Sequence, residues 1–246
     1  MIIKARSLCF SYNRSEKEIL RNLDFNIRAG ELVAVVGVNG SGKSTLLTVL
    51  AGLLPPTSGE LSVLGGELPQ ERSKLDGLVG LVPQNPDVFI LGAVVQEDLL
   101  LGVDPADEEA RERTLTMARE LGLADLLDNP IQTLSFGQKR KLCLASTLAS
   151  NPKLILLDEP MAGLDFPASL SVRHILSKNK KSGLTQIVAS HDLDLTADLT
   201  DSYIILQDGQ IIVQGGAEEV FPRLIKAGVR PPCWWYTGDG PAWLEG

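Results

Sequence analysis

A nine-residue run, Gly37-Val-Asn-Gly-Ser-Gly-Lys-Ser-Thr45, constrains the possible folds of this 246-residue chain more than any other feature. It fits the pattern G-x-x-x-x-G-K-[ST], and it follows an apolar, β-branched run at 31–36 that predicts a strand buried on both faces. A helical pattern begins near Lys43 and stops around Gly52. A strand, a glycine-rich loop and a helix in this order predict a phosphate-binding loop within an α/β fold.

Each part of this loop has a predicted task. Its glycines allow backbone N–H groups to point at phosphate oxygens, and the helix that follows directs its positive N-terminal end at the same place. Lys43 is expected to neutralise the β- and γ-phosphates, and the Ser44 hydroxyl to bind Mg²⁺. The predicted nucleotide-binding residues of the loop are Gly37, Asn39, Gly40, Ser41, Gly42, Lys43, Ser44 and Thr45.

Two acids follow a second apolar run and complete the expected chemistry. The run at 154–157 predicts a strand, and Asp158 and Glu159 come directly after it. Because ligands of open α/β sheets bind at the carboxyl ends of the strands, both acids should face the phosphates. Asp158 is expected to hold the magnesium hydration shell, and Glu159 to act as the general base that polarises the attacking water. An acid after an apolar strand is often only structural, so this assignment depends on the phosphate-binding loop.

The remaining patterns predict the architecture around this centre. Alternating apolar and polar residues at 23–27 predict a half-buried antiparallel strand. Two more short apolar runs, at 78–82 and 186–189, predict strands, and Asp208-Gly209 predicts a hairpin between 203–207 and 210–213. Between about 85 and 150 the strand patterns give way to helical ones at 94–101, 107–121 and 135–149.

These patterns predict an α/β fold with a mainly parallel core sheet, an antiparallel β flank and an inserted helical subdomain. We expect one domain over residues 1–228, with the helical subdomain at about 85–150. Residues 229–246 form a tail rich in Trp, Pro and Gly that should pack on the core. The tail contains all three tryptophans of the chain, Trp234, Trp235 and Trp243.

Charge and composition exclude several classes of function. The net charge of −8 argues against general nucleic-acid binding, because phosphate backbones attract basic surfaces. There is no run of about 18 apolar residues, and the first six residues lack the apolar core of a signal peptide. Three widely separated cysteines favour a reducing compartment. We therefore expect a cytoplasmic chain, which can still lie against a membrane protein.

The sequence Leu134-Ser-Phe-Gly-Gln138 resembles the L-S-G-G-Q signature of ABC-type ATPases. It precedes the strand that leads to Asp158 by 20 residues, as in that family. The spacing of Ser135 and Gln138 is also typical of a capping box at a helix start, and both interpretations can hold. A helix start with a free glycine amide and a serine hydroxyl is a good receptor for a γ-phosphate.

Other family motifs occur in the expected order, and together the resemblance covers Met1 to about Ala227. Tyr12 matches the aromatic residue that stacks on adenine, and Gln84 matches the glutamine that reaches Mg²⁺ and the attacking water. Asp165 ends a segment, 161–165, that matches the family's loop crossing to a partner subunit, and His191 matches the switch that contacts the γ-phosphate. The resemblance implies ATP and Mg²⁺ as cofactors and adds Tyr12, Gln84, Ser135, Gly137, Gln138, Asp165 and His191 to the site.

Two residues depart from the family pattern. Phe136 replaces the first signature glycine, and Lys141 stands where an arginine usually follows the signature. Ser135 and Gly137, the expected phosphate contacts, remain. Because Glu159 is also present, we expect a competent ATPase rather than a nucleotide-binding scaffold without turnover.

Within the family, Gln84-Asn-Pro-Asp87 and the segment from Glu97 to Gly102 resemble the ATPase subunits of energy-coupling factor transporters, which import cobalt, nickel and vitamins. The resemblance implies a dimer with a second ABC ATPase subunit, either an identical chain or a close paralogue. It also implies separate transmembrane subunits and a place at the cytoplasmic face of the membrane. The alternative is a soluble ABC ATPase of translation or DNA repair, although the single phosphate-binding loop, the lack of heptads and the acidic balance argue against it.

A surface for the membrane partner is expected just after Gln84. Exposed Phe89, Ile90 and Leu91 would form its apolar centre, and Asp87, Glu97 and Asp98 its acidic rim. Such a surface suits a basic amphipathic helix. The alternative is that these acids only stabilise helix starts through the helix dipole.

Overall fold

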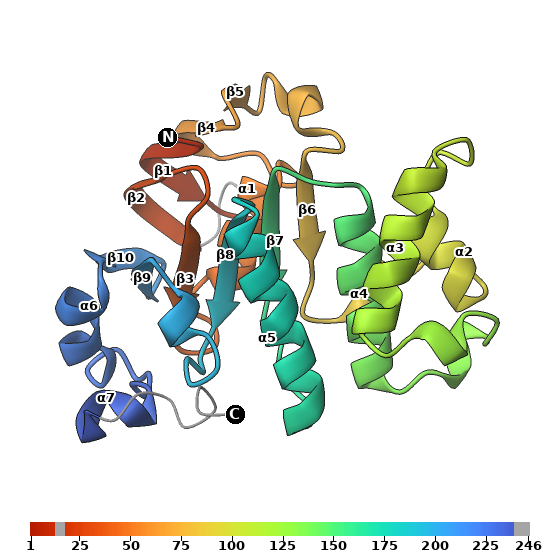
Figure 1. The fold of residues 1–246 in the computed structure, drawn as a ribbon. Coiled ribbons are helices and arrows are strands. Elements are labelled where there is room, and N and C mark those ends of the chain that lie inside the picture. Colours follow the sequence, from red (N-terminus) through yellow and green to blue (C-terminus); the bar gives the residue numbers. More distant parts are fainter. Residues whose placement is uncertain (13–17, 239–246) are drawn as a thin grey trace.

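The computed structural model describes residues 1–12 and 18–238, and at its centre lies a six-stranded sheet in the order β10-β9-β3-β8-β7-β6 (Figure 1). Neighbouring strands from β9 to β6 run parallel, and only β10 at the edge is antiparallel to its neighbour. The strands predicted for this region are confirmed, including the hairpin, in which Asp208 and Gly209 both have positive φ. The bounds are β3 Leu32–Val36, β6 Val79–Val82, β7 Leu154–Asp158, β8 Thr185–Ser190, β9 Ser202–Gln207 and β10 Gln210–Gly215.

An antiparallel sheet in the order β2-β1-β4-β5 covers one face of the core sheet. In β2, Leu23, Phe25 and Ile27 are buried while Asp24 and Asn26 are exposed, which confirms the predicted alternation. Helix α1 (Lys43–Leu50) packs its buried leucines into the apolar core shared by the two sheets. The bounds of this sheet are β1 Ile3–Phe10, β2 Leu20–Ile27, β4 Ser58–Val63 and β5 Gly66–Leu68.

The other face of the core sheet is covered by helices. Val172, Ile175 and Leu176 of α5 pack on it, and α6 packs beside β9. The three helices predicted between 94 and 149 are confirmed. The remaining α-helices are α2 Val95–Leu100, α3 Glu108–Glu120, α4 Phe136–Ala149, α5 Phe166–Lys181, α6 Ala217–Leu224 and α7 Cys233–Thr237, and the 3₁₀ helices are Arg72–Leu75, Pro86–Val88, Ala124–Leu126, Ile131–Thr133 and Ala197–Leu199.

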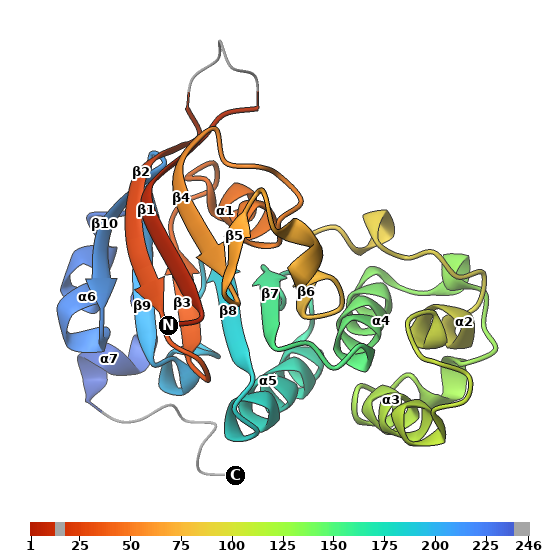
Figure 2. The ribbon, with the colours of Figure 1, turned by 90° about the horizontal axis from the view of Figure 1, so that it is seen from above.

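Helices α2, α3 and α4 form an inserted subdomain beyond β6, at the opposite end of the molecule from α6 and α7 (Figures 1 and 2). Leu142 and Leu148 of α4 belong to the same apolar cluster as Ile155 and Leu157 of β7. The helical subdomain therefore shares a continuous core with the sheet. The expected fold class is confirmed: a mainly parallel core sheet, an antiparallel β flank and an inserted helical subdomain.

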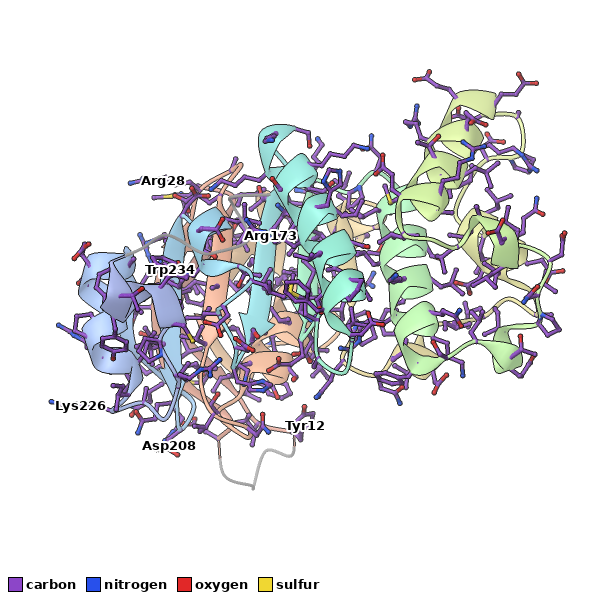
Figure 3. The ribbon with its side chains drawn as sticks, turned by 60° about the horizontal axis from the view of Figure 1, so that its bottom comes forward. Tyr12, Arg28, Arg173, Asp208, Lys226 and Trp234 are labelled. Carbon is purple, nitrogen blue, oxygen red and sulfur yellow. The ribbon has the colours of Figure 1, made fainter. Side chains whose placement is uncertain are left out.

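The C-terminal segment packs beside α6, where Figure 3 labels Trp234. The rings of Trp234 and Trp235 meet the ring of Phe221 edge-on, with centroids 6.3 Å and 4.9 Å away. Trp243, the third tryptophan of the tail, lies outside the described residues. None of the helices formed by residues 1–12 and 18–238 combines the length and the apolar character that a membrane crossing requires.

The expectation that Asp98 lines a docking surface is wrong. Its side chain is 5% exposed and accepts backbone N–H groups of Leu91 (2.8 Å) and Gly92 (3.1 Å) and the hydroxyl of Ser146 (2.9 Å). A buried carboxylate needs such donors, because an unsatisfied charge in the interior is costly. Asp98 therefore ties the 86–94 loop and α2 to α4. Ile90 also differs from the expectation, since it packs against the core rather than lying exposed.

Replacing Asp98 by alanine should lower the free energy of unfolding by about 1–3 kcal/mol, because three donors lose their acceptor in the interior. Urea unfolding followed by circular dichroism measures the difference. Asp128→Ala, at an exposed position of the same subdomain, is the matched control and should stay within about 0.5 kcal/mol of the native protein. Equal stability of the two variants would contradict the structural role of Asp98.

Candidate functional site

The candidate site lies where three parallel strands end. In the sheet Val36 of β3 pairs with Ser190 of β8, and Asp158 of β7 pairs with Ala189 of β8. Because these strands run parallel and in register, the loops that follow them leave the sheet at one edge. The three loops contain the residues from Gly37 onward, Glu159, and His191.

The loop between β3 and α1 wraps tightly around the end of the Lys43 side chain. At Gly37, a Cβ atom would lie 2.2 Å from the carbonyl oxygen of Leu206, and Gly42 has a φ of 107°. Glycine is required at the first position because a side chain would clash, and at the second because other residues rarely adopt this φ. The Lys43 ammonium donates to the carbonyl oxygens of Gly37 (2.7 Å) and Val38 (3.3 Å). The loop therefore holds this cation at the edge of the sheet.

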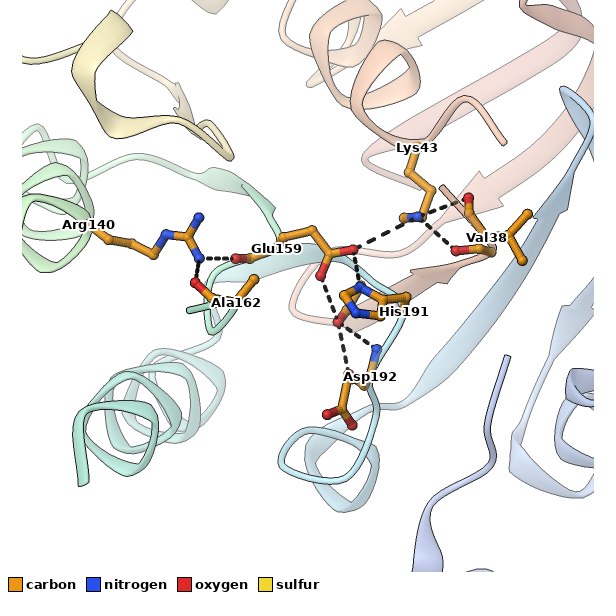
Figure 4. Close-up of polar contacts among 9 residues, drawn as sticks. Val38, Lys43, Arg140, Glu159, Ala162, His191 and Asp192 are labelled. Atoms are coloured by element: carbon orange, nitrogen blue, oxygen red, sulfur yellow. Dashed lines mark hydrogen bonds and ion pairs between the residues drawn. The ribbon is translucent and has the colours of Figure 1, made fainter. Parts of the chain in front are cut away.

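Glu159 connects the three loops (Figure 4). Its Oε1 lies 3.9 Å from the Lys43 ammonium and 2.8 Å from Nδ1 of His191, and its Oε2 accepts the Ser190 hydroxyl at 3.3 Å. The side chain is 6% exposed. Its backbone has a φ of 49°, a left-handed conformation that is strained for a glutamate. Strain of this kind persists where surrounding contacts fix the geometry of a side chain.

Burial changes the protonation equilibria of the neighbouring charges. It lowers the pKa of Lys43, an effect that Glu159 and Asp158 oppose by attraction. It raises the pKa of Asp158, and a hydrogen bond from Ser44 is the main opposing influence. One buried carboxylate oxygen of Asp158, Oδ1, has no hydrogen-bond partner. An unpartnered carboxylate oxygen beside a hydroxyl suits Mg²⁺, which binds one or two protein oxygens and completes its octahedron with phosphates and waters.

A cavity of about 420 Å³ brings together the predicted residues of one half-site. Tyr12, labelled in Figure 3, lies at its rim, 60% exposed, with its hydroxyl 3.2 Å from Oγ1 of Thr45. Ser41, within the loop itself, is buried. His191 lines a second cavity, to which Glu159 also contributes. The predicted residues that line the 420 Å³ cavity are Tyr12, Asn39, Gly40, Gly42, Lys43, Ser44, Thr45, Gln84, Asp158 and Glu159.

The signature residues do not join this half-site in the same chain. Ser135, Gly137, Gln138 and Asp165 line a separate cavity of about 620 Å³. Ser135 and Gln138 form the expected capping box at the start of α4, with bonds of 3.2 Å and 2.8 Å. Asp165 caps α5 by accepting the N–H of Ala168 at 2.8 Å. One chain therefore places the predicted phosphate-binding residues and the predicted signature residues in two separate cavities, the two predicted half-sites.

Sequence reasoning missed Arg140. It stands within the polar stretch 139–141, yet it is 2% exposed and donates to the backbone carbonyl oxygens of Gln84, Glu159 and Ala162. The signal was its spacing: residue 140 lies one helical turn before Cys143 and Leu144, both of which are buried. Helical periodicity therefore places it on the inner face of α4.

Comparisons with known proteins identify the family of the chain. The sequence profile of the ABC transporter family matches residues 20–162. The chain is 34% identical over 226 residues to the energy-coupling factor transporter ATP-binding protein EcfA of Methanosphaera stadtmanae, covering 89% of this chain and 81% of that one. CbiO1 of Clostridium perfringens, part of the ABC transporter complex CbiONQ, superposes with a TM-score of 0.76 at 33% identity over 90% of both chains.

A dimeric ATP-binding cassette in a post-hydrolysis state, bound to ADP and Pi, superposes with a TM-score of 0.78 at 27% identity, over 87% of this chain and 98% of that one. The family profile matches more than half of the present chain, and the EcfA relative aligns over most of both lengths. The chain therefore belongs to the ABC transporter family of ATPases, with energy-coupling factor ATP-binding proteins among its relatives.

Proposed function

We propose that this chain binds ATP with Mg²⁺, hydrolyses it, and thereby powers an importer of the energy-coupling factor type for cobalt or nickel ions or for a vitamin. The single observation that carries the ATPase role is the meeting of Lys43, Asp158 and Glu159 at one sheet edge. The importer role is supported by the 34% identity to an energy-coupling factor ATP-binding protein. We further propose an ABC ATPase domain at 1–228, with a helical subdomain at about 85–150 and a tail at 229–246.

In the proposed ATP complex, Tyr12 stacks on the adenine and the loop 37–45 surrounds the phosphates. The Lys43 ammonium, now held by two carbonyl oxygens and Glu159, turns to the β- and γ-phosphates. Ser44 and Asp158 would hold Mg²⁺ together with Gln84, and the ion would neutralise developing charge on the phosphates. Burial makes the negative charge of Asp158 energetically costly, as the raised pKa of this carboxyl shows. A divalent cation bound beside the carboxylate would reduce that cost, which supports the assignment.

Glu159 is proposed to take the proton from the attacking water. A general base must lie within hydrogen-bond reach of its proton and be held in a fixed direction. Ser190 and His191 supply that direction through both carboxylate oxygens. Gln84 would position the water from the opposite loop, and His191 would contact the γ-phosphate.

Two chains are proposed to complete each site. Ser135, Gly137 and Gln138 of one chain would contact the γ-phosphate bound by the loop of the other, with Asp165 at the crossing loop. Their separate cavity supports this arrangement. No residue of the 37–45 loop lines it, so the signature residues would meet a phosphate only when the loop of a second chain supplies it. The partner would be an identical chain or a close paralogue. A peripheral position at the cytoplasmic face of the membrane follows from the proposed transmembrane subunits.

A reduced version of the expected docking surface remains available to such subunits. Val88, Phe89 and Leu91 are 65%, 41% and 75% exposed, and we call them the apolar patch. Exposed Asp87, which is paired with Lys139 at 2.8 Å, and exposed Glu97 lie beside it in the chain. An apolar surface with acidic neighbours suits a basic amphipathic helix. A soluble ABC ATPase of translation or DNA repair would have no use for this patch, and the comparisons favour transport.

Glu159→Gln should slow ATP hydrolysis by about 10²–10⁴, the usual contribution of a general base, while ATP binding persists. The rate of phosphate release measures turnover, and size exclusion with ATP should show an accumulating dimer because hydrolysis no longer separates the chains. Glu60→Gln, at an exposed position of β4, is the matched control and should keep the native rate. Native turnover in Glu159→Gln would remove Glu159 from the role of base.

The docking proposal predicts that Asp87→Lys/Leu91→Lys detaches the ATPase from its transmembrane subunits, because two new cations repel a basic helix and interrupt the apolar patch. Co-purification of the assembled transporter measures attachment, and calorimetry should find nearly native ATP affinity in the isolated chain. Glu218→Lys/Ile225→Lys makes the same change in charge around α6, near the labelled Lys226 and away from the patch (Figure 3). Equal attachment of both double variants would show that docking occurs elsewhere.

A further inference from the structure

Arg140 is the most deeply buried cation of the helical subdomain, with 2% of its surface exposed. Arginine is almost never fully buried unless its charge is compensated by partners. The side chain leaves the second turn of α4 and enters the junction between the helical subdomain and the edge of the core sheet (Figure 4). An apolar side chain would fill this buried position of α4 without the cost of burying a charge, so the arginine requires an explanation.

Its guanidinium binds backbone from two loops at once. Nη1 donates to the carbonyl oxygen of Glu159 at 2.7 Å and to that of Ala162, and Nη2 donates to the carbonyl oxygen of Gln84 at 2.5 Å. The first two carbonyls belong to the loop after β7, and the third to the loop after β6. Arg140 thus joins three elements: the loop that contains Glu159, the loop that contains Gln84, and α4.

Phe136 supports this arrangement from the same helix. The centre of its ring lies 5.0 Å from the central carbon of the Arg140 guanidinium, within the range of a cation–π contact. The ring also lies against Gly163, in the loop that follows Glu159. Phe136 is the residue that replaces the first glycine of the family signature. This replacement therefore lies in direct contact with the buried arginine.

We propose that Arg140, supported by Phe136, is a positioning residue that holds the Glu159 carboxylate in its reactive direction and couples it to Gln84 and to α4. The proposal rests on the proposed role of Glu159 as general base. It assigns no contact with ATP to Arg140, which acts only through the backbone of the two loops.

The backbone of Glu159 shows why such support matters. Its φ of 49° is unfavourable, so the residue stays there only while its peptide groups are held. Its N–H donates to the carbonyl oxygen of Ala189 at 2.9 Å on the side of β8. Its carbonyl oxygen accepts from Arg140 at 2.7 Å on the side of α4 and from the N–H of Ala162, within its own loop, at 3.1 Å. Loss of the arginine leaves this carbonyl with the local bond from Ala162 alone, removes its tie to α4, and allows the carboxylate to turn from His191.

Lysine cannot replace Arg140 in this role. The guanidinium is a planar fork whose donors point in fixed directions, and it reaches carbonyls on both loops. An ammonium is a compact charge at the end of a flexible stem, and it would donate to fewer of the three carbonyl oxygens that Arg140 binds. Arg140→Lys therefore keeps the charge and tests the geometry alone.

The test compares ATP hydrolysis by the native chain, Arg140→Lys and Arg113→Lys, the last being an exposed arginine of α3 in the same subdomain. We expect Arg140→Lys to lower kcat about 10²-fold, the cost of a displaced catalytic group, with the KM for ATP nearly unchanged. Arg113→Lys should behave as the native chain. A kcat for Arg140→Lys within twofold of native would overturn the proposal.

A second background separates positioning from general damage. In Glu159→Gln the positioned carboxylate is already gone, so adding Arg140→Lys should slow single-turnover hydrolysis less than threefold. An equal slowdown in both backgrounds would mean a merely structural role and would overturn the proposal. If Glu159→Gln itself turns over normally, the role of the base fails; if Glu159→Gln is slow and Arg140→Lys is normal, only the positioning role fails.

Thermal unfolding shows whether Arg140→Lys folds. If it does not, Phe136→Leu provides the test instead. Leucine retains apolar contact with the loop but removes the aromatic face that the guanidinium covers. We expect a kcat about threefold to tenfold below native, with an unchanged KM, because the cation–π contact is partly desolvated. A native kcat in Phe136→Leu would then overturn the proposal.

Discussion

The shared edge of β3, β8 and β7 is the constraint on which the site depends. Parallel pairing in register brings the loop before α1, the acid after β7 and the histidine after β8 to one place, so that Glu159 contacts both Lys43 and His191. Antiparallel pairing or a one-residue slip would send these loops or side chains apart. The buried charges then define the proposed chemistry. One ammonium, that of Lys43, faces the carboxylates of Glu159 and Asp158, and the triphosphate of a bound ATP would compete with Glu159 for it.

The helical subdomain is attached to this edge by polar contacts as well as by its apolar core. Asp98 ties α2 and the preceding loop to α4, and Arg140 ties α4 to the loops of Gln84 and Glu159. Both are buried ions whose partners are mainly backbone groups. In the proposed role of Arg140, a movement of α4 would reach the backbone of Glu159 through this contact. The same helix begins at the signature residue Ser135, which lines the second half-site.

Much of this could be predicted from sequence because local patterns dictate it. The Gly37–Thr45 loop, the buried strands and the Asp208-Gly209 turn each depend on neighbouring residues, and the structure has them where expected. Strand β1 was missed because Ser7 has a φ of 45° and the pairing with β2 shifts register between Ala5 and Leu8, which breaks the alternation of apolar residues.

Long-range partners explain the other differences. Asp98 and Arg140 look like surface charges in the sequence. Arg140 is buried by the packing of α4 against two distant loops, and Asp98 by its contacts with Ser146 of α4 and with the loop before α2. No local pattern states that Ser146 or the carbonyl oxygen of Gln84 will be their partners. The separation of the two half-sites is likewise a property of the folded chain. It leads to the central claim that an intact ATP site takes its phosphate-binding loop and its signature from different chains.

Mixing two inactive variants tests that claim most directly. Lys43→Ala removes the phosphate-binding half-site, and Ser135→Ala removes a signature contact, so differently tagged chains can be paired and the mixed dimers purified through both tags. The account predicts that mixed dimers recover up to about half of the native ATPase rate, because one of their two sites joins an intact loop to an intact signature. Mixed dimers as inactive as either variant alone would contradict it, since both half-sites would then be needed in the same chain.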